Sequence, residues 1–205
     1  MKSEKKRKLV FDMGSVLVHL SYPYALNQMH LSEEAKRAIL AVGRIPGLWD
    51  MLDSNSLELA RGAEIYGEHV PDYPKEAEYA FLHMTEYIKA IDKNVSVLRK
   101  AVRSGYDCYY LSNFQKDNWK TLHEKVDFFP LFKGGTVSWR VGCIKPNKEI
   151  YERFLNENSL KAEECLFIDD LTENTKAAEE MGFSTITLAS EDNLEEKLAE
   201  KGIVL

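Results

Sequence analysis

Short, continuously apolar runs alternate with amphipathic segments along the chain from residue 91 to its end. In the amphipathic segments the apolar side chains recur every three to four residues, which is the period of an α-helix. The apolar runs have the length and the two-sided hydrophobicity of strands in a parallel sheet, whose faces are both covered by helices. The pattern predicts an α/β fold: a three-layer, Rossmann-like core with a mainly parallel sheet.

The predicted strands and helices follow one another regularly. Strands are expected over residues 8–13, 107–111, 135–138, 165–168 and 184–188. Helices are expected over residues 91–105, 115–124, 147–158, 172–182 and from 192 or 193 to 202. Pro146 is expected at the first position of the third helix, where proline is favoured because its missing N–H would be unpaired there anyway.

The segment that precedes residue 91 has a different character. Helix-forming stretches near residues 32–42, 56–66 and 75–88 are separated by glycine and proline, and no run between them resembles a strand. We therefore expect a helical bundle inserted after the first strand. On this interpretation residues 1–17 and 92–205 form the α/β core domain, and residues 18–91 form a helical domain.

Composition and charge restrict the classes of function. Of the 205 residues, 44% are hydrophobic and 29% are charged, and the formal net charge is −6. Binding to nucleic acid needs a basic surface, so this charge argues against it. The apolar runs are too short to cross a bilayer. The basic residues 1–8 lack the apolar core of a signal peptide and are expected to be a solvated lead-in, which favours a cytoplasmic protein.

The three cysteines are widely spaced and form no C-x-x-C motif. They are Cys108, Cys143 and Cys165, and two of them fall inside predicted strands. Because metal and disulfide frameworks rest on closely or regularly spaced cysteines, we expect buried thiols instead.

Polar side chains follow several of the predicted strands at the point where each strand ends. Asp12 follows the first strand, Ser112 and Asn113 follow the second, and the pair Asp169-Asp170 ends the strand that begins at residue 165. In a doubly wound sheet, ligands bind beyond the carboxyl ends of the strands. We expect these residues to converge on one site, with Lys145 joining them from the start of the third helix.

The chemistry of this set indicates a phosphate ester and a metal ion. Three carboxylates placed together repel one another unless a cation neutralises them, and an all-oxygen ligand set suits Mg²⁺. The amine of Lys145 and the hydroxyl of Ser112 are then suited to bind a phosphate. An aspartate with an ordinary pKa is ionised at neutral pH, so Asp12 can act as a nucleophile toward phosphorus.

These segments, taken in order, resemble the four motifs of the haloacid dehalogenase-like hydrolase superfamily. The motifs correspond to Val10-Phe11-Asp12-Met13-Gly14-Ser15-Val16-Leu17, Leu111-Ser112-Asn113, Lys145-Pro146 and Phe167-Ile168-Asp169-Asp170-Leu171-Thr172-Glu173-Asn174. Each motif is weak by itself, but their order and spacing cover nearly the whole chain. The inserted helices resemble the helical (C1) cap of that superfamily.

The resemblance implies a role for each residue of the predicted site. Asp12 would be the nucleophile that forms an aspartyl-phosphate. Ser112 and the backbone of Asn113 would bind the transferring phosphoryl group, and Lys145 would neutralise both Asp12 and phosphate oxygens. The implied ligands of Mg²⁺ are Asp12, the Gly14 carbonyl, Asp170 and, directly or through water, Asp169.

The first motif departs from the commonest pattern of these phosphatases. Most of them carry a second aspartate two residues after the nucleophile, which acts as general acid and base, whereas this chain has Gly14. The pattern D-x-G-x-V-L resembles a branch that includes glucose-1-phosphatase-like enzymes. The substitution favours a substrate with a good leaving group, unless a water molecule or a cap residue replaces the missing aspartate.

Structural roles compete with these functional ones. Asp169 or Asp170 would also serve as a helix cap, Ser112-Asn113 as a turn, and Asn174 as a support for the loop around it. In the helical domain we consider four residues as substrate-facing candidates, and one more at the end of the first motif. They are Arg44, Trp49, Asp50 and His83, together with His19.

Three other functions compete with this interpretation. A response-regulator receiver places its acidic pair after the first strand and lacks a long insertion, so the order of the motifs excludes it. A carbon–halogen hydrolase needs no metal, which leaves Asp169-Asp170 without a purpose. A non-catalytic binding protein of the same fold stays open because of Gly14. We therefore predict a Mg²⁺-dependent phosphatase for a small phosphomonoester, first a sugar phosphate, acting as a monomer or homodimer.

Overall fold

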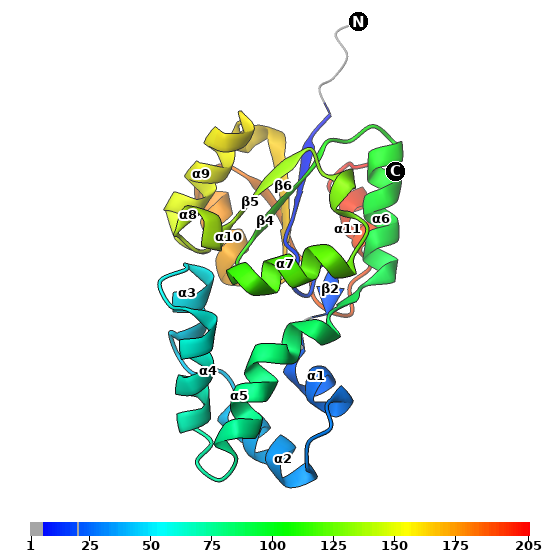
Figure 1. Cartoon of the computed structure of the whole chain (residues 1–205). Coiled ribbons are helices and arrows are strands. Elements are labelled where there is room, and N and C mark those ends of the chain that lie inside the picture. The colour runs from blue at the N-terminus through cyan, green and yellow to red at the C-terminus, as the bar shows by residue number, and fades with distance from the viewer. Residues whose placement is uncertain (1–5, 20) are drawn as a thin grey trace, which may run out of the picture.

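The computed structural model describes residues 6–19 and 21–205 of the chain. Most of the predicted basic lead-in lies outside the described residues, as far as residue 5. The fold consists of an α/β half and a smaller all-helical half, which Figure 1 shows one above the other.

A five-stranded sheet forms the centre of the α/β half. All of its neighbouring strands are parallel, in the order β5-β4-β1-β6-β7. The strands are β1 (Lys8–Phe11), β4 (Cys108–Ser112), β5 (Gly134–Val137), β6 (Cys165–Asp169) and β7 (Ser184–Thr187). The α/β prediction is confirmed, and each of the five predicted strands is present with its ends shifted by a few residues at most.

The register of the central strands decides which polar residues meet. Phe11, the last residue of β1, lies opposite Tyr110 of β4 and Ile168 of β6. Because all three strands run in the same direction, the residues that follow emerge at one edge of the sheet. Asp12 and Asp169 therefore leave the sheet side by side.

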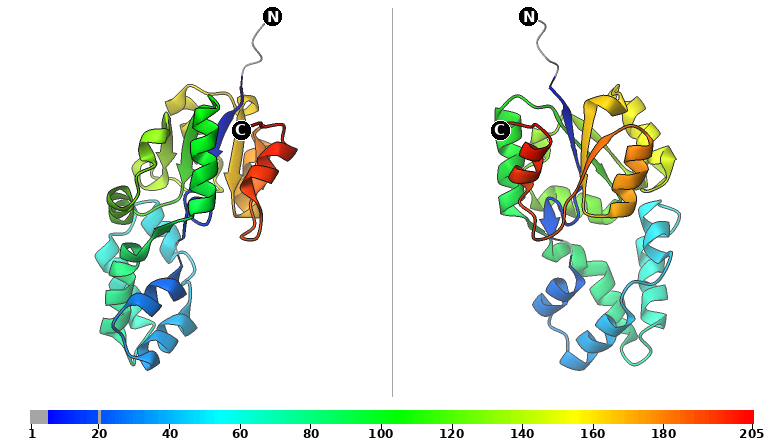
Figure 2. Two further views of the ribbon diagram at one scale, coloured as in Figure 1. Left: turned by 90° about the vertical axis from the view of Figure 1, so that its right-hand side faces the viewer. Right: turned by 180° about the vertical axis from the view of Figure 1, so that it is seen from behind.

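Helices cover both faces of the sheet, as Figure 2 shows from the side and from behind. Alternate residues of β1 point to opposite faces: Leu9 and Phe11 join one buried cluster, and Val10 joins the other. The first face packs against α6 (Asp92–Arg103), α7 (Lys116–Lys125) and α11 (Leu194–Glu200). The second packs against α9 (Lys148–Asn158) and α10 (Thr172–Glu180).

Some short elements of this half were not predicted. They are α8 (Ser138–Val141), η2 (Phe129–Leu131) and η3 (Ala162–Glu164). They are too short to show a helical period in the sequence. The expectation for Pro146 was wrong: α9 begins at Lys148 with Asn147 as its N-cap, and a cis peptide bond joins Lys145 to Pro146. The three cysteines are free thiols; Cys108 and Cys165 are buried as predicted, whereas Cys143 is only partly buried.

The helical half lies between two very short strands that form an antiparallel ribbon. These strands are β2 (Val18–His19) and β3 (Lys89–Ala90). The elements between them, called the insertion below, are α1 (Tyr22–Gln28), α2 (Glu33–Val42), α3 (Leu48–Asp53), α4 (Leu59–Glu68), α5 (Pro74–His83) and η1 (Met84–Tyr87). The insertion has its own buried cluster, which includes Leu26, Ile39, Tyr66 and Phe81.

Three elements of this half were missed from the sequence. The helices α2, α4 and α5 match the three predicted ones, whereas α1, α3 and the ribbon were not expected. The ribbon has only two residues in each strand. Helix α3 has six residues and directly follows Gly47, which adopts a left-handed conformation with φ of 76°. Segments of this length carry no readable hydrophobic period.

Within the described residues, two contacts beyond the ribbon join the insertion to the α/β half. One is α3, which packs against α8, and the other is η1, which packs against α7 and where the Thr85 hydroxyl donates to the Asn118 side chain. Both places lie at the edge of the sheet where the strands end. The insertion therefore covers the predicted site.

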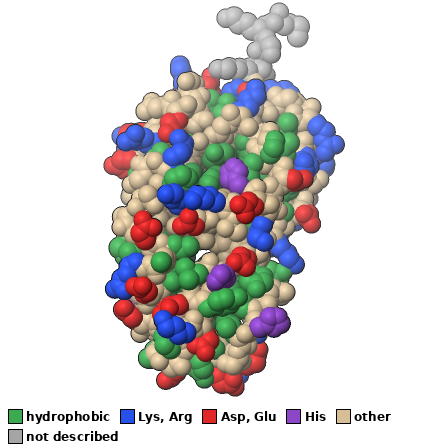
Figure 3. All heavy atoms as spheres, in the orientation of Figure 1, with side chains coloured by type: hydrophobic (Ala, Val, Ile, Leu, Met, Phe, Trp, Pro, Cys, Tyr) green, Lys and Arg blue, Asp and Glu red, His purple; other side chains and the backbone are tan. Residues whose placement is uncertain are grey.

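The face of the molecule seen in Figure 3 shows no single dominant charge. Acidic and basic side chains are interspersed over the face seen in Figure 3. Within residues 6–19 and 21–205, no helix combines the length and the hydrophobicity that crossing a membrane requires.

Candidate active site

The carboxyl ends of β1, β4 and β6 bring the predicted residues to one place. Asp12 directly follows β1, while Ser112 and Asp169 are the last residues of β4 and β6. All three side chains are buried. The structure therefore brings these three strand ends together, as the sequence analysis expected.

Lys145 lies at the centre of this group. Its ammonium is 2.8 Å from Asp12 Oδ1, and it donates hydrogen bonds to Asp169 Oδ2 at 2.6 Å and to the Leu111 carbonyl at 3.1 Å. Burial by itself would lower the pKa of Lys145, but the neighbouring charges of Asp12 and Asp169 raise it above its ordinary value. The ammonium is therefore charged at neutral pH.

Asp169 is held from every side by protein groups. One carboxylate oxygen accepts the hydrogen bond from Lys145, and the other accepts from the Leu171 N–H and from the Asn174 amide, both at 2.9 Å. Asn174 thus supports the loop after β6, the structural role considered for it in the sequence. Because Asp169 is occupied in this way, its geometry suits orientation of Lys145 more than direct coordination of a metal.

Asp12 and Asp170 both have pKa values above that of an ordinary aspartate. Burial raises the pKa of Asp12 to about 6; the Lys145 charge opposes this, and the Asp169 charge adds to it. Burial also raises the pKa of Asp170, with a further contribution from Asp169, while a hydrogen bond from Ser15 lowers it. A positive charge placed between these carboxylates would favour their ionised forms.

The donor set fits a divalent cation of the magnesium type. Asp12, Asp169 and Asp170 each offer a carboxylate oxygen, and these oxygens lie within 4.8 Å of one another. In the described part of the chain, Lys145 is the only buried lysine or arginine, so the three carboxylates exceed the local positive charge by two. Oxygen ligands and this charge match the preference of Mg²⁺.

Gly14 belongs to a tight loop that follows β1. Its carbonyl accepts a hydrogen bond from the Val16 N–H at 2.7 Å, and a carbonyl oxygen has a second lone pair that can serve a metal. The loop is fixed from behind, because the Asn94 amide donates to the Val16 carbonyl at 2.7 Å. Gly14 also lines the cavity described below.

Ser112 and Asn113 have different geometric roles. The Ser112 hydroxyl is buried and lies beside the Asp12 carboxylate, whose pKa it lowers; within residues 6–19 and 21–205 it has no hydrogen bond of standard geometry. The Asn113 side chain donates to the Lys145 carbonyl at 2.9 Å and accepts from the Lys145 N–H at 2.8 Å. Asn113 therefore fixes the backbone that presents the lysine.

A cavity of about 410 Å³ opens above these residues, between the sheet edge and the insertion. From the α/β half it is lined by Asp12, Gly14, Ser15, Asn113, Ile144, Lys145, Pro146, Asp170, Leu171, Glu173 and Asn174. From the insertion it is lined by Tyr22, Arg44, Trp49, Asp50, Asp53 and Met84. Asp12 and Lys145 thus face a space large enough for a small substrate.

Three of the five substrate-facing candidates from the sequence line this cavity. They are Arg44, Trp49 and Asp50, and the Arg44 guanidinium lies over the Trp49 ring at 5.5 Å. The other two are not among the lining residues: His83 pairs with Glu86 at 2.6 Å on the surface of the insertion, and His19 is exposed on β2.

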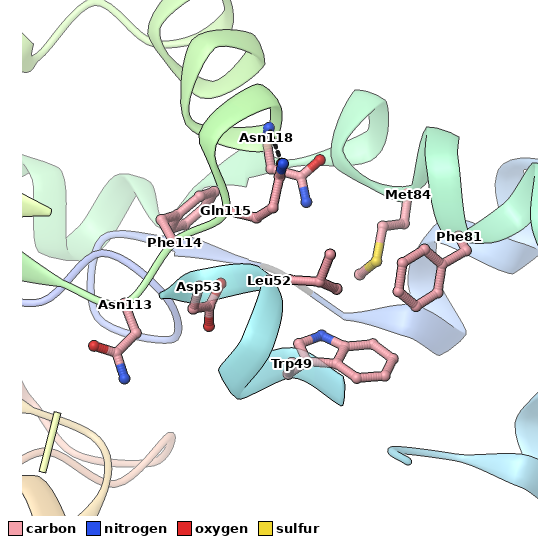
Figure 4. Close-up of a pocket in the computed structure, with 9 residues that line it drawn as sticks. All are labelled: Trp49, Leu52, Asp53, Phe81, Met84, Asn113, Phe114, Gln115 and Asn118. Atoms are coloured by element: carbon pink, nitrogen blue, oxygen red, sulfur yellow. Dashed lines mark hydrogen bonds between the residues drawn. The ribbon is translucent and has the colours of Figure 1, made fainter. Parts of the chain in front are cut away.

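A smaller recess of about 60 Å³ adjoins the cavity, and Figure 4 shows the side chains around it. Its walls are mainly apolar. They comprise Trp49, Leu52, Phe81, Met84 and Phe114, with Asp53, Asn113, Gln115 and Asn118 as the polar members. The cavity therefore has a polar floor and a partly apolar side.

The model of the haloacid dehalogenase-like hydrolase family matches residues 7–182, which is most of the chain. The chain belongs to the haloacid dehalogenase-like hydrolases. The match includes the strand ends that carry Asp12, Ser112, Lys145 and Asp169, so family membership and the observed convergence of these residues concern the same part of the molecule.

Curated and solved relatives of this hydrolase are distant in sequence. A sesquiterpene phosphatase of Aspergillus oryzae is 26% identical over 84% of this chain and 85% of its own. A family enzyme of Bacteroides thetaiotaomicron, solved as a magnesium complex, has a TM-score of 0.73 at 20% identity and covers 93% of this chain and 97% of its own.

Two further structures agree in fold. The same Bacteroides enzyme with magnesium and inorganic phosphate has a TM-score of 0.69 at 19% identity, covering 94% of this chain and 98% of its own. A predicted family hydrolase of Porphyromonas gingivalis has a TM-score of 0.73 at 21% identity, covering 98% and 99%. At such identities the structures establish the fold that this hydrolase shares.

Asp53 is a cavity residue of the hydrolase that sequence reasoning missed. It is the last residue of α3, a helix that was not predicted. The spacing of Asp50 and Asp53, three residues apart, would have placed both on one helical face if the helix had been recognised. Burial raises the pKa of Asp53 to about 7, with Arg44 opposing the shift and Asp50 adding to it.

This shift predicts how the stability of the metal-free hydrolase depends on pH. The unfolded chain releases the Asp53 proton near the ordinary value of 3.8, whereas the folded chain retains it up to about 7. Between these values the folded state binds more protons, so the contribution of Asp53 to the free energy of unfolding falls by about 1.4 kcal/mol per pH unit as pH rises. Asp53→Asn should therefore be more stable than the wild type at pH 8.

Urea denaturation of both proteins at several pH values measures this difference. We expect it to shrink as the pH falls from about 7 toward 3.8, because the folded carboxyl is then neutral and the unfolded carboxyl increasingly binds its proton as well. Asp72→Asn, at an exposed position of the insertion away from the cavity, serves as the matched control. A difference that stays constant with pH would show that Asp53 titrates normally.

Proposed function

We propose that the chain is a Mg²⁺-dependent phosphatase that hydrolyses a small phosphomonoester through an aspartyl-phosphate on Asp12. The observation that carries this proposal is the set of buried, charged side chains at the cavity floor. There Asp12 lies 2.8 Å from the Lys145 ammonium, within a cluster of three carboxylates that fits a divalent cation. The sesquiterpene phosphatase relative supports phosphate-ester chemistry.

Each residue at the floor has a part in the proposed reaction. One carboxylate oxygen of Asp12 attacks phosphorus, and the bond from phosphorus to the leaving-group oxygen breaks. Lys145 stabilises the charge of the phosphoryl oxygens while remaining fixed by Asp169. The Ser112 hydroxyl, which lies beside Asp12, donates to a phosphoryl oxygen. Water then hydrolyses the aspartyl-phosphate.

A bound Mg²⁺ would supply charge that neutralises the carboxylates and the phosphoryl group. Asp12, Asp170 and the Gly14 carbonyl are the residues proposed to hold it, with Asp169 acting through Lys145 or through water. The ion would also favour the ionised form of Asp12, whose pKa burial raises.

We propose that residues 18–91 act as a cap domain over the site, the helical type of cap anticipated from the sequence. The contacts of α3 with α8 and of η1 with α7 keep the insertion over the cavity. A closed cap would exclude water while Asp12 is being phosphorylated and would place the leaving group against Tyr22, Trp49 and Asp50.

Two substrate classes suit this cavity wall. Arg44, Asp50 and Asp53 offer charged groups to the hydroxyls of a sugar phosphate, the class that the resemblance to glucose-1-phosphatase-like enzymes suggested. The apolar recess formed by Leu52 and Phe81, among others, favours a leaving group with a hydrocarbon part, as in the sesquiterpene phosphatase relative. We place the sugar phosphate first, because the charged groups lie in the larger cavity.

Phosphate release from a panel of esters tests the proposed function. The panel would contain sugar phosphates, an acyl phosphate, a prenyl phosphate and 4-nitrophenyl phosphate, each assayed with Mg²⁺ and with a chelator. We expect release that requires Mg²⁺ and that differs among leaving groups. Folded protein that releases phosphate from none of them would favour a binding protein, and halide release from a haloacid without metal would favour the carbon–halogen hydrolase.

A further inference from the structure

The proposed reaction needs a proton donor that the cavity floor does not provide. When phosphorus moves to Asp12, the leaving oxygen of an alkyl or sugar ester is strongly basic and must be protonated as its bond breaks. Lys145 is fixed by three contacts, and Asp12 is the nucleophile. Gly14 has no side chain, and a Cβ at this position would meet no atom within 4 Å.

Asp53, in the insertion, is a candidate for the missing proton donor. It ends α3 and lines the same cavity as Asp12, Gly14 and Lys145. Figure 4 shows its side chain on the side of the recess toward Asn113, a residue that lines both the recess and the cavity. The contact of α3 with α8 anchors this helix to the α/β half, so the carboxyl group is held over the site.

The surroundings of Asp53 allow it to carry a proton near neutral pH. The carboxyl group is half-buried, and burial is the main reason that its pKa rises to about 7. Four charged groups act on it as well: Arg44 and Lys145 lower the pKa, and Asp50 and Asp12 raise it. A general acid is most effective when its pKa lies near the working pH.

The other acidic residues of the cavity are less suited to the task. Asp50 and Glu173 are exposed, which places their carboxylates in water. Asp170 belongs to the proposed metal site. Among the carboxylates that the described chain places around this cavity, Asp53 is thus the one that combines partial burial with independence from the metal cluster.

We propose that Asp53 is the general acid and base of the reaction, an inference that rests on the proposed function. In the first step Asp12 Oδ bonds to phosphorus, the ester P–O bond breaks, and the protonated Asp53 gives its proton to the leaving oxygen. In the second step the Asp53 carboxylate takes a proton from the water that attacks the aspartyl-phosphate. Asp12 and the protonated Asp53 are both regenerated, so atoms and charge balance.

The test compares two leaving groups in Asp53→Asn. For an alkyl or sugar phosphate, kcat/KM should fall by about 10²–10⁴-fold, the usual contribution of a positioned acid. For 4-nitrophenyl phosphate, kcat/KM should stay close to that of the wild type, because nitrophenolate leaves without a proton. For this substrate the kcat and the KM of Asp53→Asn should fall together, since hydrolysis of the aspartyl-phosphate becomes slow.

Two further variants give the experiment its controls. Asp72→Asn removes an exposed carboxylate from the insertion and should leave kcat/KM for both substrates unchanged. Gly14→Asp, made in the Asp53→Asn background, introduces a carboxylate beside Asp12 where a Cβ has open space, and should restore part of the rate with the alkyl ester. Simple damage to the cavity would not be repaired in this way.

The possible outcomes separate this inference from the function on which it rests. An equal loss of kcat/KM with both leaving groups, or no loss with either, would overturn the role of Asp53 while leaving the phosphatase intact. If Asp50→Asn, and not Asp53→Asn, lowers kcat/KM for the alkyl ester alone, the role proposed for Asp53 is wrong as well. A wild-type protein inactive toward 4-nitrophenyl phosphate and every other ester would instead reject the proposed function itself.

Discussion

Asp12→Asn is expected to lower the rate of phosphate release by about 10⁴-fold or more. The amide has nearly the shape of the carboxylate but is a very poor nucleophile, so the covalent step is lost while the surrounding geometry stays the same. The protein should remain folded, because burial disfavours the charged form of Asp12 and the neutral amide avoids that cost. Phosphate release and thermal unfolding, measured on one preparation, test both statements.

The control for this variant is Asp107→Asn. Asp107 is, like Asp12, a carboxylate paired with lysine, here with Lys8 and Lys133, but it is only partly buried and lies before β4 at the opposite end of the sheet. Its removal should leave activity close to the wild-type level. Release by Asp12→Asn at a tenth of the wild-type rate or more would show that Asp12 is not the nucleophile.

Lys145→Met is expected to be the most destabilising single substitution at the site. The change leaves Asp12 and Asp169 buried without their shared cation, and breaking a buried ion pair in this way costs about 3–5 kcal/mol. Activity should be lost together with stability, because the phosphoryl charge loses its partner. Urea denaturation without metal gives the change in the free energy of unfolding.

Lys148→Met is the matched control three residues further along the chain. The Lys148 ammonium pairs with Glu152 at 3.0 Å, but the lysine side chain is 70% exposed, and such pairs contribute about 1 kcal/mol at most. Added Mg²⁺ should recover part of the stability of Lys145→Met, since a divalent cation supplies the missing positive charge. A loss below about 1 kcal/mol for Lys145→Met would contradict the central role of this ion pair.

Much of the α/β half could be predicted because its signals are local. The strands around Val10 and Phe167 are continuously apolar, and the helix that ends near Arg103 shows a clear helical period. Each of these elements can therefore be predicted from a few consecutive residues. The polar residues that follow each strand could also be identified from the sequence. Parallel strands leave their ends at one edge, so Asp12 and Asp169 had to meet if the sheet formed.

Short elements and the arrangement of side chains could not be predicted in this way. The helix α3 has six residues and is held in place by packing against α8 and α4, so nothing in its own sequence sets it apart from a loop. Asp53 was missed together with this helix. The hydrogen bonds of Asn113 to the Lys145 backbone join residues that are 32 positions apart, and no local pattern encodes them.

The class of fold and the chemical groups at the end of the sheet follow from local sequence, because periodicity and strand order depend on neighbouring residues. The interactions among those groups follow from the three-dimensional packing: Lys145 lies between two carboxylates, Asp169 is saturated by hydrogen bonds, and the insertion brings Asp53 over the site. Burial and electrostatic coupling depend on residues distant in the chain. They therefore arise only when the two halves pack together.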